Sequence, residues 1–229
     1  MPTKYTYILV DFFCVIFPFL FSFHPKINFY KQWKYFLLPC IITALFFIVW
    51  DILFAHWDIW HFNPSYILGV YFLNLPIEEM LFFVCVPYAC VFTYYSLTLF
   101  LNFSFFNKKA LSFSLLLAAT LLIIALFNQQ KLYTSVTFIL LAILLSILSI
   151  KRVNYLSSFF VSFLIILLPF FISNGILTGS FIKEPVVIYN NSYNLSIRLF
   201  TIPLEDIFYG MLLLLMNIGG FELLRSRRI

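Results

Sequence analysis

The chain has 229 residues, of which 63% are hydrophobic and 10% charged, and its mean hydropathy is +1.02. A soluble domain of this length could not bury so much apolar surface, so the composition excludes a soluble globular protein and predicts a polytopic membrane protein. The net charge of +5 comes from basic residues near the ends of apolar runs. This placement favours anchoring in membrane lipids over binding of nucleic acid.

Seven apolar runs are long enough to cross the roughly 30 Å hydrocarbon core as helices. In chain order they are approximately 5–23, 35–55, 77–100, 109–127, 132–150, 154–174 and 203–224. The first run is rich in Phe and lacks the small-residue cleavage site of a signal peptide, so it is interpreted as the first span. Two connectors, about 56–75 and 175–202, are apolar and aromatic, which is typical of segments at the interface or dipping into the bilayer. The predicted fold class is an all-α integral membrane protein with about seven transmembrane helices.

Basic residues predict the orientation of these spans, because Lys and Arg are enriched on the cytoplasmic side. Ten lie on the side that holds the first, third and fifth loops and the C-terminus, and four lie on the other side. The C-terminus is therefore expected in the cytoplasm and the N-terminus outside, in a bacterial cytoplasmic membrane. The ten are Lys26, Lys31, Lys34, Lys108, Lys109, Lys151, Arg152, Arg225, Arg227 and Arg228, and the four are Lys4, Lys131, Lys183 and Arg198.

One short acidic motif occurs twice, each time at the start of an apolar run. The first copy is Pro76-Ile77-Glu78-Glu79, and the second, 127 residues later, is Pro203-Leu204-Glu205-Asp206. Acids in a first helical turn after a proline also make a good helix start, which is the structural interpretation of a single copy. A carboxylate at the centre of a membrane helix costs roughly 2.5–3.5 kcal/mol, however, and two matched copies favour a role in chemistry or transport.

The matched motifs also predict an internal duplication. Residues 1–105 would form a first repeat of three spans, 106–130 a connecting span, and 131–229 a second repeat of three spans. The third and seventh spans are four crossings apart and so run in the same direction. The two copies are therefore expected to be parallel, related by an axis along the membrane normal, and to converge on one site.

The acidic pairs suggest general acid catalysis. Apolar surroundings favour the neutral form of a carboxyl group, and a neutral carboxylic acid can donate a proton. Adjacent residues on a helix point about 100° apart, so one acid of each pair is expected to face the interior. The other acid would cap the helix or pair with a base such as Arg198. Asp51, which lies in an apolar stretch, is a further candidate, and at the 127-residue offset Thr178 falls opposite to it.

Four stretches together resemble the membrane-integral lycopene cyclase domain family, in its fused form with both halves in one chain. They are Trp50-Asp51, Pro76 to Phe83, Asn174 to Gly179 and Ile202 to Asp206. The resemblance covers nearly the whole chain. It implies conversion of the acyclic ψ ends of lycopene, a lipid-soluble substrate dissolved in the bilayer, into β-ionone rings. The products would be γ- and β-carotene, formed through a carbocation without net redox change.

The resemblance and the motifs give a set of expected site residues. The acid and the base are expected among Glu78, Glu79, Glu205 and Asp206, with Asp51 assisting. Substrate contacts are expected from Trp50, Asn174, Thr178 and Tyr209. Pro76 and Pro203 are expected to begin the motif helices.

No metal or organic cofactor is predicted. Asp51, His56, Asp58 and His61 are a conceivable metal set, but three histidines in the whole chain are too few for a membrane di-iron centre. The six glycines form no GxGxxG motif, so the nucleotide fold of flavin-binding cyclases cannot be built. The four cysteines, without CxxC spacing, are interpreted as buried small hydrophobes.

Other functions remain open at this point. A related carotenoid enzyme would share the first cation and differ in how it is quenched, as in other ring types, C50 cyclisation or hydration. A proton-coupled transporter also uses intramembrane carboxyls and repeats, although the spans offer few other polar residues for a hydrated route. A pigment-binding structural protein is a third alternative. A retinal photoreceptor is set aside, because 203–224 contains no lysine for a Schiff base.

Overall fold

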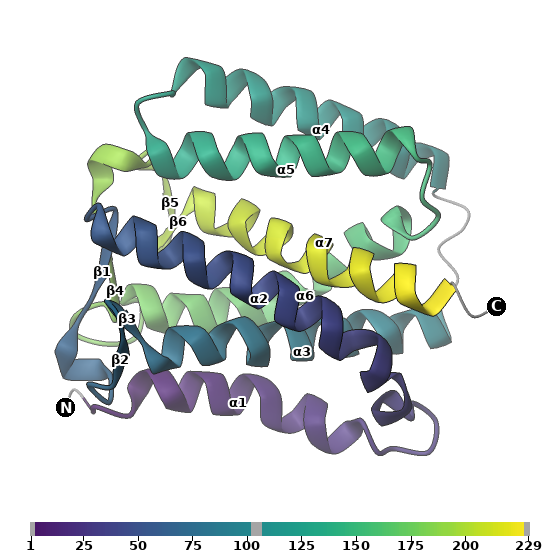
Figure 1. Cartoon of the computed structure of the whole chain (residues 1–229), viewed down its shortest axis with the longest axis horizontal. Helices are drawn as coiled ribbons and strands as arrows, with labels where there is room; N and C mark the ends of the chain where they lie inside the picture. The colour runs from purple at the N-terminus through teal and green to yellow at the C-terminus, as the bar shows by residue number, and fades with distance from the viewer. Residues whose placement is uncertain (1–2, 102–106, 227–229) are drawn as a thin grey trace.

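The computed structural model describes residues 3–101 and 107–226, and this part of the chain folds as a bundle of seven helices (Figure 1). Six helices are long and apolar enough to cross a membrane, whereas the first, at 16 residues, is shorter. The expected all-α membrane fold is thereby confirmed. The helices are α1 Thr6–Phe21, α2 Trp33–His56, α3 Ile77–Phe100, α4 Asn107–Phe127, α5 Leu132–Ile150, α6 Leu156–Thr178 and α7 Leu204–Ser226.

The outer surface of the bundle is apolar, as expected for contact with lipid. Large hydrophobic side chains on successive helices are exposed, for example Leu38 (54%), Leu116 (67%) and Leu168 (70%). Exposed apolar patches of this extent are typical of a surface that contacts lipid or another protein. The helices therefore bury one side against each other and leave the other for the bilayer.

One helix end differs from the sequence expectation. The apolar run was expected to end at residue 174, but α6 continues to Thr178. It stops at Gly179, whose φ of +100° places it in the left-handed conformation that commonly ends a helix. The polar Asn174 consequently lies inside the last turns of α6 and not in a loop.

The two aromatic connectors fold into short strands and 3₁₀ turns at the same end of the bundle as the N-terminus, while the C-terminus lies at the opposite end (Figure 1). Each connector contains a strand, a 3₁₀ turn and a small hairpin that leads directly into an acidic helix. The first has β1 Trp60–Phe62, η2 Pro64–Tyr66, β2 Tyr71–Phe72 and β3 Leu75–Pro76. The second has β4 Val187–Tyr189, η4 Asn191–Tyr193, β5 Arg198–Leu199 and β6 Ile202–Pro203.

The two hairpins match at an offset of 127 residues. Tyr71 pairs with Pro76 in the first, as Arg198 pairs with Pro203 in the second. The hairpin turns share a positive φ at equivalent places, 56° at Leu73 and 58° at Phe200. A non-glycine residue in this region is uncommon, so its occurrence twice supports a common origin of the connectors.

The strands β1 and β4 pair with one another and relate the two halves of the chain. The antiparallel register joins Trp60 to Tyr189, His61 to Ile188 and Phe62 to Val187. At the same 127-residue offset Trp60 corresponds to Val187 and Phe62 to Tyr189, so the ladder is self-complementary, as at a two-fold interface. An approximate two-fold axis thus passes between His61 and Ile188. The domain limits at 105 and 130 stay a prediction.

Helix packing follows the same approximate symmetry, with one exception. The α1–α3 contact is matched by α5–α7, and the α2–α7 contact is matched by α6–α3, while α4 covers α5 and α6. The exception is that α2 packs closely against both α3 and α7, whereas α6 packs mainly against α3 and α4. The bundle is therefore looser on the α6 side.

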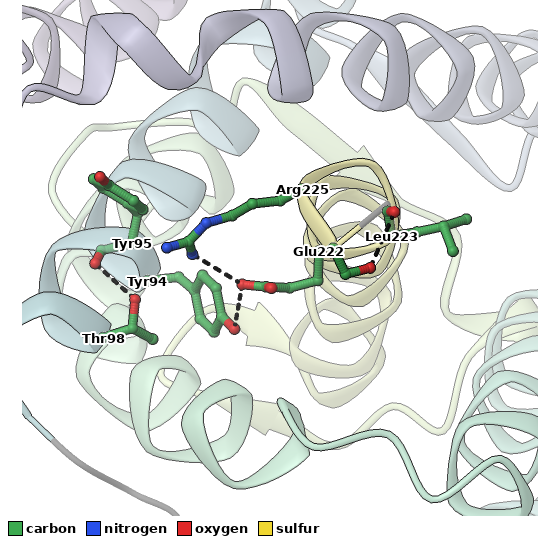
Figure 2. Close-up of polar contacts among 7 residues, drawn as sticks. Tyr94, Tyr95, Thr98, Glu222, Leu223 and Arg225 are labelled. Carbon is green, nitrogen blue, oxygen red and sulfur yellow. Dashed lines mark hydrogen bonds and ion pairs between the residues drawn. The ribbon is translucent and has the colours of Figure 1, made fainter. Parts of the chain in front are cut away.

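At the end of the bundle away from the strands, a polar cluster ties α3 to α7 (Figure 2). The Tyr94 hydroxyl donates to Glu222 Oε1 at 2.9 Å, and Arg225 lies 3.6 Å from the same oxygen. The Arg225 guanidinium also lies over the Tyr95 ring, 5.2 Å from its centroid. The two motif helices are thus fixed to each other at the end opposite the acids.

Candidate functional site

A cavity of about 650 Å³ lies between α1, α3, α6 and α7, with residues of β1 and β4 at one end. This is within the range of small-molecule sites. Its walls are mostly apolar and aromatic, and its polar groups include three of the expected acids, Asp51, Glu79 and Asp206. Asn174 and Tyr209 also line it. The structure thus brings one acid from each motif, and Asp51, into a single apolar space.

Within each motif the two acids face different ways, as the helical geometry predicts. Glu79 and Asp206 line the cavity, whereas Glu78 and Glu205 do not and have 0% exposure. Glu78 accepts a hydrogen bond from the Leu68 amide at 2.6 Å, and Glu205 accepts one from the Leu195 amide at 2.7 Å. The first acid of each motif therefore fastens the preceding connector to the start of its helix.

The suggested pairing with Arg198 is not observed. This guanidinium donates to the Thr201 carbonyl at 2.6 Å and to Asn191 Oδ1 at 2.9 Å. Glu205 instead accepts a second hydrogen bond from the Thr134 hydroxyl at 2.6 Å. Glu205 therefore has a neutral hydroxyl and an amide as its partners, while Arg198 forms hydrogen bonds within the connector.

The acid of the first repeat belongs to a pair of carboxyl groups. Glu79 Oε2 accepts from the Tyr7 hydroxyl at 2.5 Å, and the Glu79 and Asp51 side chains are hydrogen-bonded to each other. Asp51 Oδ1 in turn accepts from the Tyr209 hydroxyl at 2.7 Å. Because an ionised carboxylate can only accept, a hydrogen bond between two carboxyl groups requires that one of them carry a proton. The first cluster is therefore built to hold a proton.

The acid of the second repeat is surrounded by neutral donors. Asp206 Oδ1 accepts from the Tyr133 hydroxyl at 2.6 Å, and Oδ2 accepts from Asn174 Nδ2 at 2.8 Å and the Tyr189 hydroxyl at 2.9 Å. Burial and the nearby Asp206 charge raise the pKa of the Tyr189 hydroxyl well above its ordinary value, so it stays a donor. Several hydrogen bonds to one carboxyl stabilise its anionic form. The Asp206 carboxyl group therefore has three neutral donors around it and no hydrogen bond to a second carboxyl group among the described residues.

The expected correspondence of Thr178 with Asp51 is wrong. Asn174 contacts Asp206 as Asp51 contacts Glu79, which is an offset of 123 residues and not 127. Thr178 donates to the Asn174 carbonyl at 2.8 Å and bonds to Thr201 at 2.7 Å, away from the cavity lining. The four-residue difference is about one helical turn, so the same face of the helix is kept. The longer segment between α6 and β4 absorbs it.

Three further residues expected at the site, Trp50, Pro76 and Pro203, lie next to the cavity residues and do not line the cavity. Trp50 stacks on Phe47 at 5.6 Å and contacts the Tyr209 ring edge-on at 5.3 Å. Pro76 and Pro203 lie immediately before α3 and α7, as the last hairpin residues and not as the first helical ones. Each proline ends its hairpin at the residue that precedes the acidic turn.

Three tyrosines that donate hydrogen bonds to the acids were not expected from the sequence. Tyr7 and Tyr133 lie near the starts of α1 and α5, and Tyr189 lies on β4. A detectable signal existed for two of them, since each follows a lysine by two or three residues at the start of the first span of a repeat. With 14 tyrosines in the chain, no pattern singled out Tyr189.

A fourth missed residue is Asp11, one turn after Tyr7 on α1. It is 1% exposed, and neither of its carboxyl oxygens has a hydrogen-bond partner among the described residues. An unpaired buried carboxylate would be very costly in an apolar span, so this group is expected to be neutral. It does not line the cavity.

The conceivable metal set is dispersed. Asp58 and His61 form an exposed pair at 3.5 Å, whereas Asp51 is 2% exposed and engaged with Glu79 and Tyr209. Within residues 3–101 and 107–226, no three side chains of the usual ligand types form a cluster. The geometry of Asp51 is that of a hydrogen-bonded acid.

Aromatic rings surround the acids. Trp60 lies 5.1 Å from Tyr133 and 6.0 Å from Tyr189, ring centre to ring centre, and 6.4 Å from Tyr209. Phe82 of α3 lines the same cavity. Faces of such rings attract cations, so a positive charge formed between the acids would meet aromatic walls and a carboxylate.

Fold and site together define a multi-helix membrane protein in which a hydrogen-bonded pair of carboxyl groups and a separate carboxyl group share one apolar, aromatic cavity. A family model described as lycopene cyclase matches residues 4–97 and 130–224. The two matched segments correspond to the two repeats and leave out the region of α4. The chain belongs to the lycopene cyclase family. Comparisons with curated proteins and with solved structures gave no match.

Proposed function

We propose that the protein is a lycopene β-cyclase that closes the ψ end groups of lycopene into β-ionone rings by acid–base chemistry. The observation that carries this proposal is that one apolar cavity holds both a hydrogen-bonded pair of carboxyl groups and a separate carboxyl group surrounded by neutral donors. Cyclisation needs both an acid and a base, because one proton is added to the substrate and another is removed.

The acid is assigned to Glu79, supported by Asp51. Glu79 donates its proton to the terminal double bond of the end group, and the alkene electron pair forms the new C–H bond. A tertiary carbocation results. The Tyr7 hydroxyl, which donates to Glu79 Oε2, stabilises the Glu79 carboxylate that remains, and the Tyr209 hydroxyl does the same for Asp51. General acid catalysis of this kind contributes typically about 10²–10⁴-fold.

Ring closure follows when a second double bond of the chain attacks the cation and forms a carbon–carbon bond. The positive charge moves into the new ring, where the faces of Trp60, Phe82 and Tyr209 are available to stabilise it. Asp206 then removes a ring proton, and the released electron pair forms the ring double bond. No atom is gained or lost, and a proton must pass from Asp206 back to the Asp51–Glu79 pair before the next turnover.

Substrate is expected to come from the bilayer. Leu9, Phe13 and Phe17 on α1 and Ile172 on α6 line the cavity and are also exposed on the outer surface, by 44%, 60%, 61% and 61%. The cavity therefore opens sideways between α1 and α6, toward the lipid. A long hydrocarbon could insert one end there without crossing water.

The orientation proposed from the basic residues places the acids near the outer face of a bacterial cytoplasmic membrane. In the structure Lys4, Lys131 and Arg198 belong to the strand-bearing end, whereas Arg225 lies at the other. Arg227 and Arg228, which also count toward the cytoplasmic side, lie outside the described residues, as does the side chain of Lys108.

The test is pigment analysis in bacterial cells that accumulate lycopene, with and without this gene. Appearance of γ- or β-carotene, abolished by Glu79→Gln or Asp206→Asn but not by the exposed Asp58→Asn, would support the proposal. A product with another ring type or a hydroxylated end would keep the acid step and change the named reaction. Unchanged lycopene, with the protein present in the membrane, would contradict the proposal.

A further inference from the structure

The cavity extends well beyond the acids. On α3 its lining residues run from Glu79 to Thr93, which are 14 residues apart, so at a rise of 1.5 Å per residue they cover about 21 Å of the helix. On α6, which ends at the strand-bearing end of the bundle, the lining runs back from Leu177 to Phe163. The acids occupy one end of this length. The remaining part, the arm of the cavity, has as its α3 wall Val86, Ala89, Cys90 and Thr93.

The arm is apolar and ends at aromatic rings. Its α6 wall includes Leu167, and its α3 wall includes Ala89. Thr93 is polar, but its hydroxyl lies 4 residues from Ala89 on α3 and donates to that residue's carbonyl at 2.8 Å. At the far end Phe163 stacks on the fully buried Phe159, with the ring centres 5.9 Å apart. A ligand in the arm is therefore held by apolar contact and by shape.

The opening toward lipid runs along the arm and not only beside the acids. Leu9, Phe13 and Phe17 follow one another at one helical turn on α1, line the cavity and are exposed on the outer surface. From Leu9 to Phe17 this edge covers about 12 Å. The opening is thus a slit parallel to the helices. A rigid linear hydrocarbon that lies parallel to the lipid chains can enter it sideways without turning.

The arm belongs to the α3 side of the bundle. Along α3 the side chains that face the cavity become smaller away from the acids, from Phe82 to Ala89. The residue 127 positions after Ala89 is Met216 of α7, which does not line the cavity. A small residue in the first repeat therefore makes room that a larger residue of the second repeat does not.

We propose that the arm binds the polyene chain of the substrate, a rigid conjugated hydrocarbon, and that Ala89 and Thr93 set the length of chain that it accepts. This inference rests on the proposed function. With one end group among the acids, the chain lies along α3 toward Thr93. The arm is far longer than an end group that closes to a single ring requires, and it is continuous with the acids. Contacts with the unreactive chain thus hold the reacting carbon at Glu79.

Binding is tested with Glu79→Gln, which keeps the shape of the cavity and cannot deliver the proton. An achiral polyene gains circular dichroism in its visible absorption band when a protein holds it, so the full-length protein in liposomes is titrated with lycopene. We expect a signal from Glu79→Gln, and the same signal when Val84→Phe, at a lipid-facing position of α3 that is 45% exposed, is added. Adding Ala89→Phe instead should weaken binding about 10-fold or more.

Chain length is tested by the rate of cyclisation in proteins with unaltered Glu79. The substrates are lycopene and a series of shortened acyclic polyenes with the same end group. Ala89 lies about 15 Å beyond Glu79 along α3, and Thr93 about 21 Å. Ala89→Phe should slow lycopene about 10-fold or more and leave the shortest polyene near its wild-type rate, which also shows that the variant is folded. Thr93→Phe should accept an intermediate length that Ala89→Phe rejects.

Three results would overturn the inference and leave the proposed function intact. Glu79→Gln may give no lycopene signal at all. Ala89→Phe may match Val84→Phe in signal and rate, which would assign the arm to a lipid acyl chain. Ala89→Phe and Thr93→Phe may each slow all chain lengths equally, which would place their effect at the acids. A lycopene signal that Ala89→Phe removes, without ring formation by the wild type from any substrate, would instead refute the proposed function and leave the arm as a polyene site.

Discussion

The two repeats share a backbone frame and differ in the chemistry at its centre. In the first, Glu79 is hydrogen-bonded to a second carboxyl group, Asp51, a contact that requires a proton on one of the two groups. In the second, Asp206 has the amide of Asn174 in the place of that carboxyl, and tyrosines around it. In the proposed mechanism, this one exchange of an acid in one half for an amide in the other separates the proton donor from the proton acceptor. Duplication supplies two acids, and divergence of their neighbours gives each a different task.

The largest expected effect comes from removing that difference. Asp51→Asn copies the residue of the second repeat into the first and takes away the shared proton. We expect the rate of lycopene cyclisation to fall by about 10²–10⁴-fold, the usual contribution of general acid catalysis. The measurement is the initial rate in isolated membranes at matched protein levels. Asp58→Asn, on the exposed surface near β1, is the control, and a rate near wild type for Asp51→Asn would show that Glu79 needs no second carboxyl group beside it.

The second prediction concerns the size of the side chain at position 210. Gly210 lines the cavity, and the residue 127 positions earlier, at the equivalent place in α3, is Phe83. Gly210→Phe therefore places a phenyl ring in the cavity. Substrate positioning should be lost, with a fall in activity of about 100-fold and a melting temperature close to wild type. Gly210→Ala should lose much less, because its methyl group would sit 3.7 Å from Phe170, in ordinary contact. Equal losses for the two variants would show that the glycine serves the backbone and not the cavity.

A smaller effect on the rate is expected from removing one of the hydrogen-bond donors to Asp206. Tyr133→Phe removes one of the three hydrogen bonds that stabilise the carboxylate. Hydrogen bonds to a charged group contribute about 1.5–3 kcal/mol, so the rate should fall about 10-fold or somewhat more. Tyr5→Phe, at a position 62% exposed on the same end of the bundle, is the matched control. If Tyr133→Phe leaves the rate unchanged, the hydroxyl has no part in holding the charge.

The smallest effect concerns the first acid of each motif and is an effect on stability. Glu205→Ala and Glu78→Ala each leave a connector amide without its hydrogen-bond acceptor. The loss is expected to lower the free energy of unfolding by about 1–3 kcal/mol. Glu205→Ala should be the worse, because Glu205 also accepts from Thr134. Thermal unfolding in detergent measures the difference. Glutamine at either position keeps an accepting oxygen and should retain most of the stability; equal loss with glutamine would point to a need for the charge.

The parts of the fold that could be predicted from the sequence are those determined by the hydrophobic pattern. Run lengths predicted the number of helices, and two prolines followed by acids located the starts of α3 and α7 to within a residue. The parallel relation of the copies followed from counting crossings, and the self-complementary β1–β4 register agrees with it. Such features are local or depend only on length, so a single chain reveals them.

What the sequence could not give depends on packing. Which acid of each motif faces the cavity is set by the rotation of α3 and α7 against their neighbours, and nothing in a Glu-Glu pair encodes it. The constant offset placed Thr178 opposite Asp51, but Asn174 takes the equivalent position, because the segment after α6 is longer than its counterpart after α2. Tyr189 reaches Asp206 only because β4 pairs with β1, a contact between distant segments.

The cluster of Tyr94, Glu222 and Arg225 has a mechanical consequence. It joins α3 to α7 at one end of the bundle, while the β1–β4 ladder joins the connectors that precede these helices at the other, so the spacing of the acids is expected to stay constant. Any widening that admits a hydrocarbon must then fall on the outer walls, above all on α1, the shortest helix. Amide hydrogen exchange should accordingly be fast along α1 and slow along α3 and α7. The helix that moves to admit the substrate would then be distinct from the helices that carry the acids.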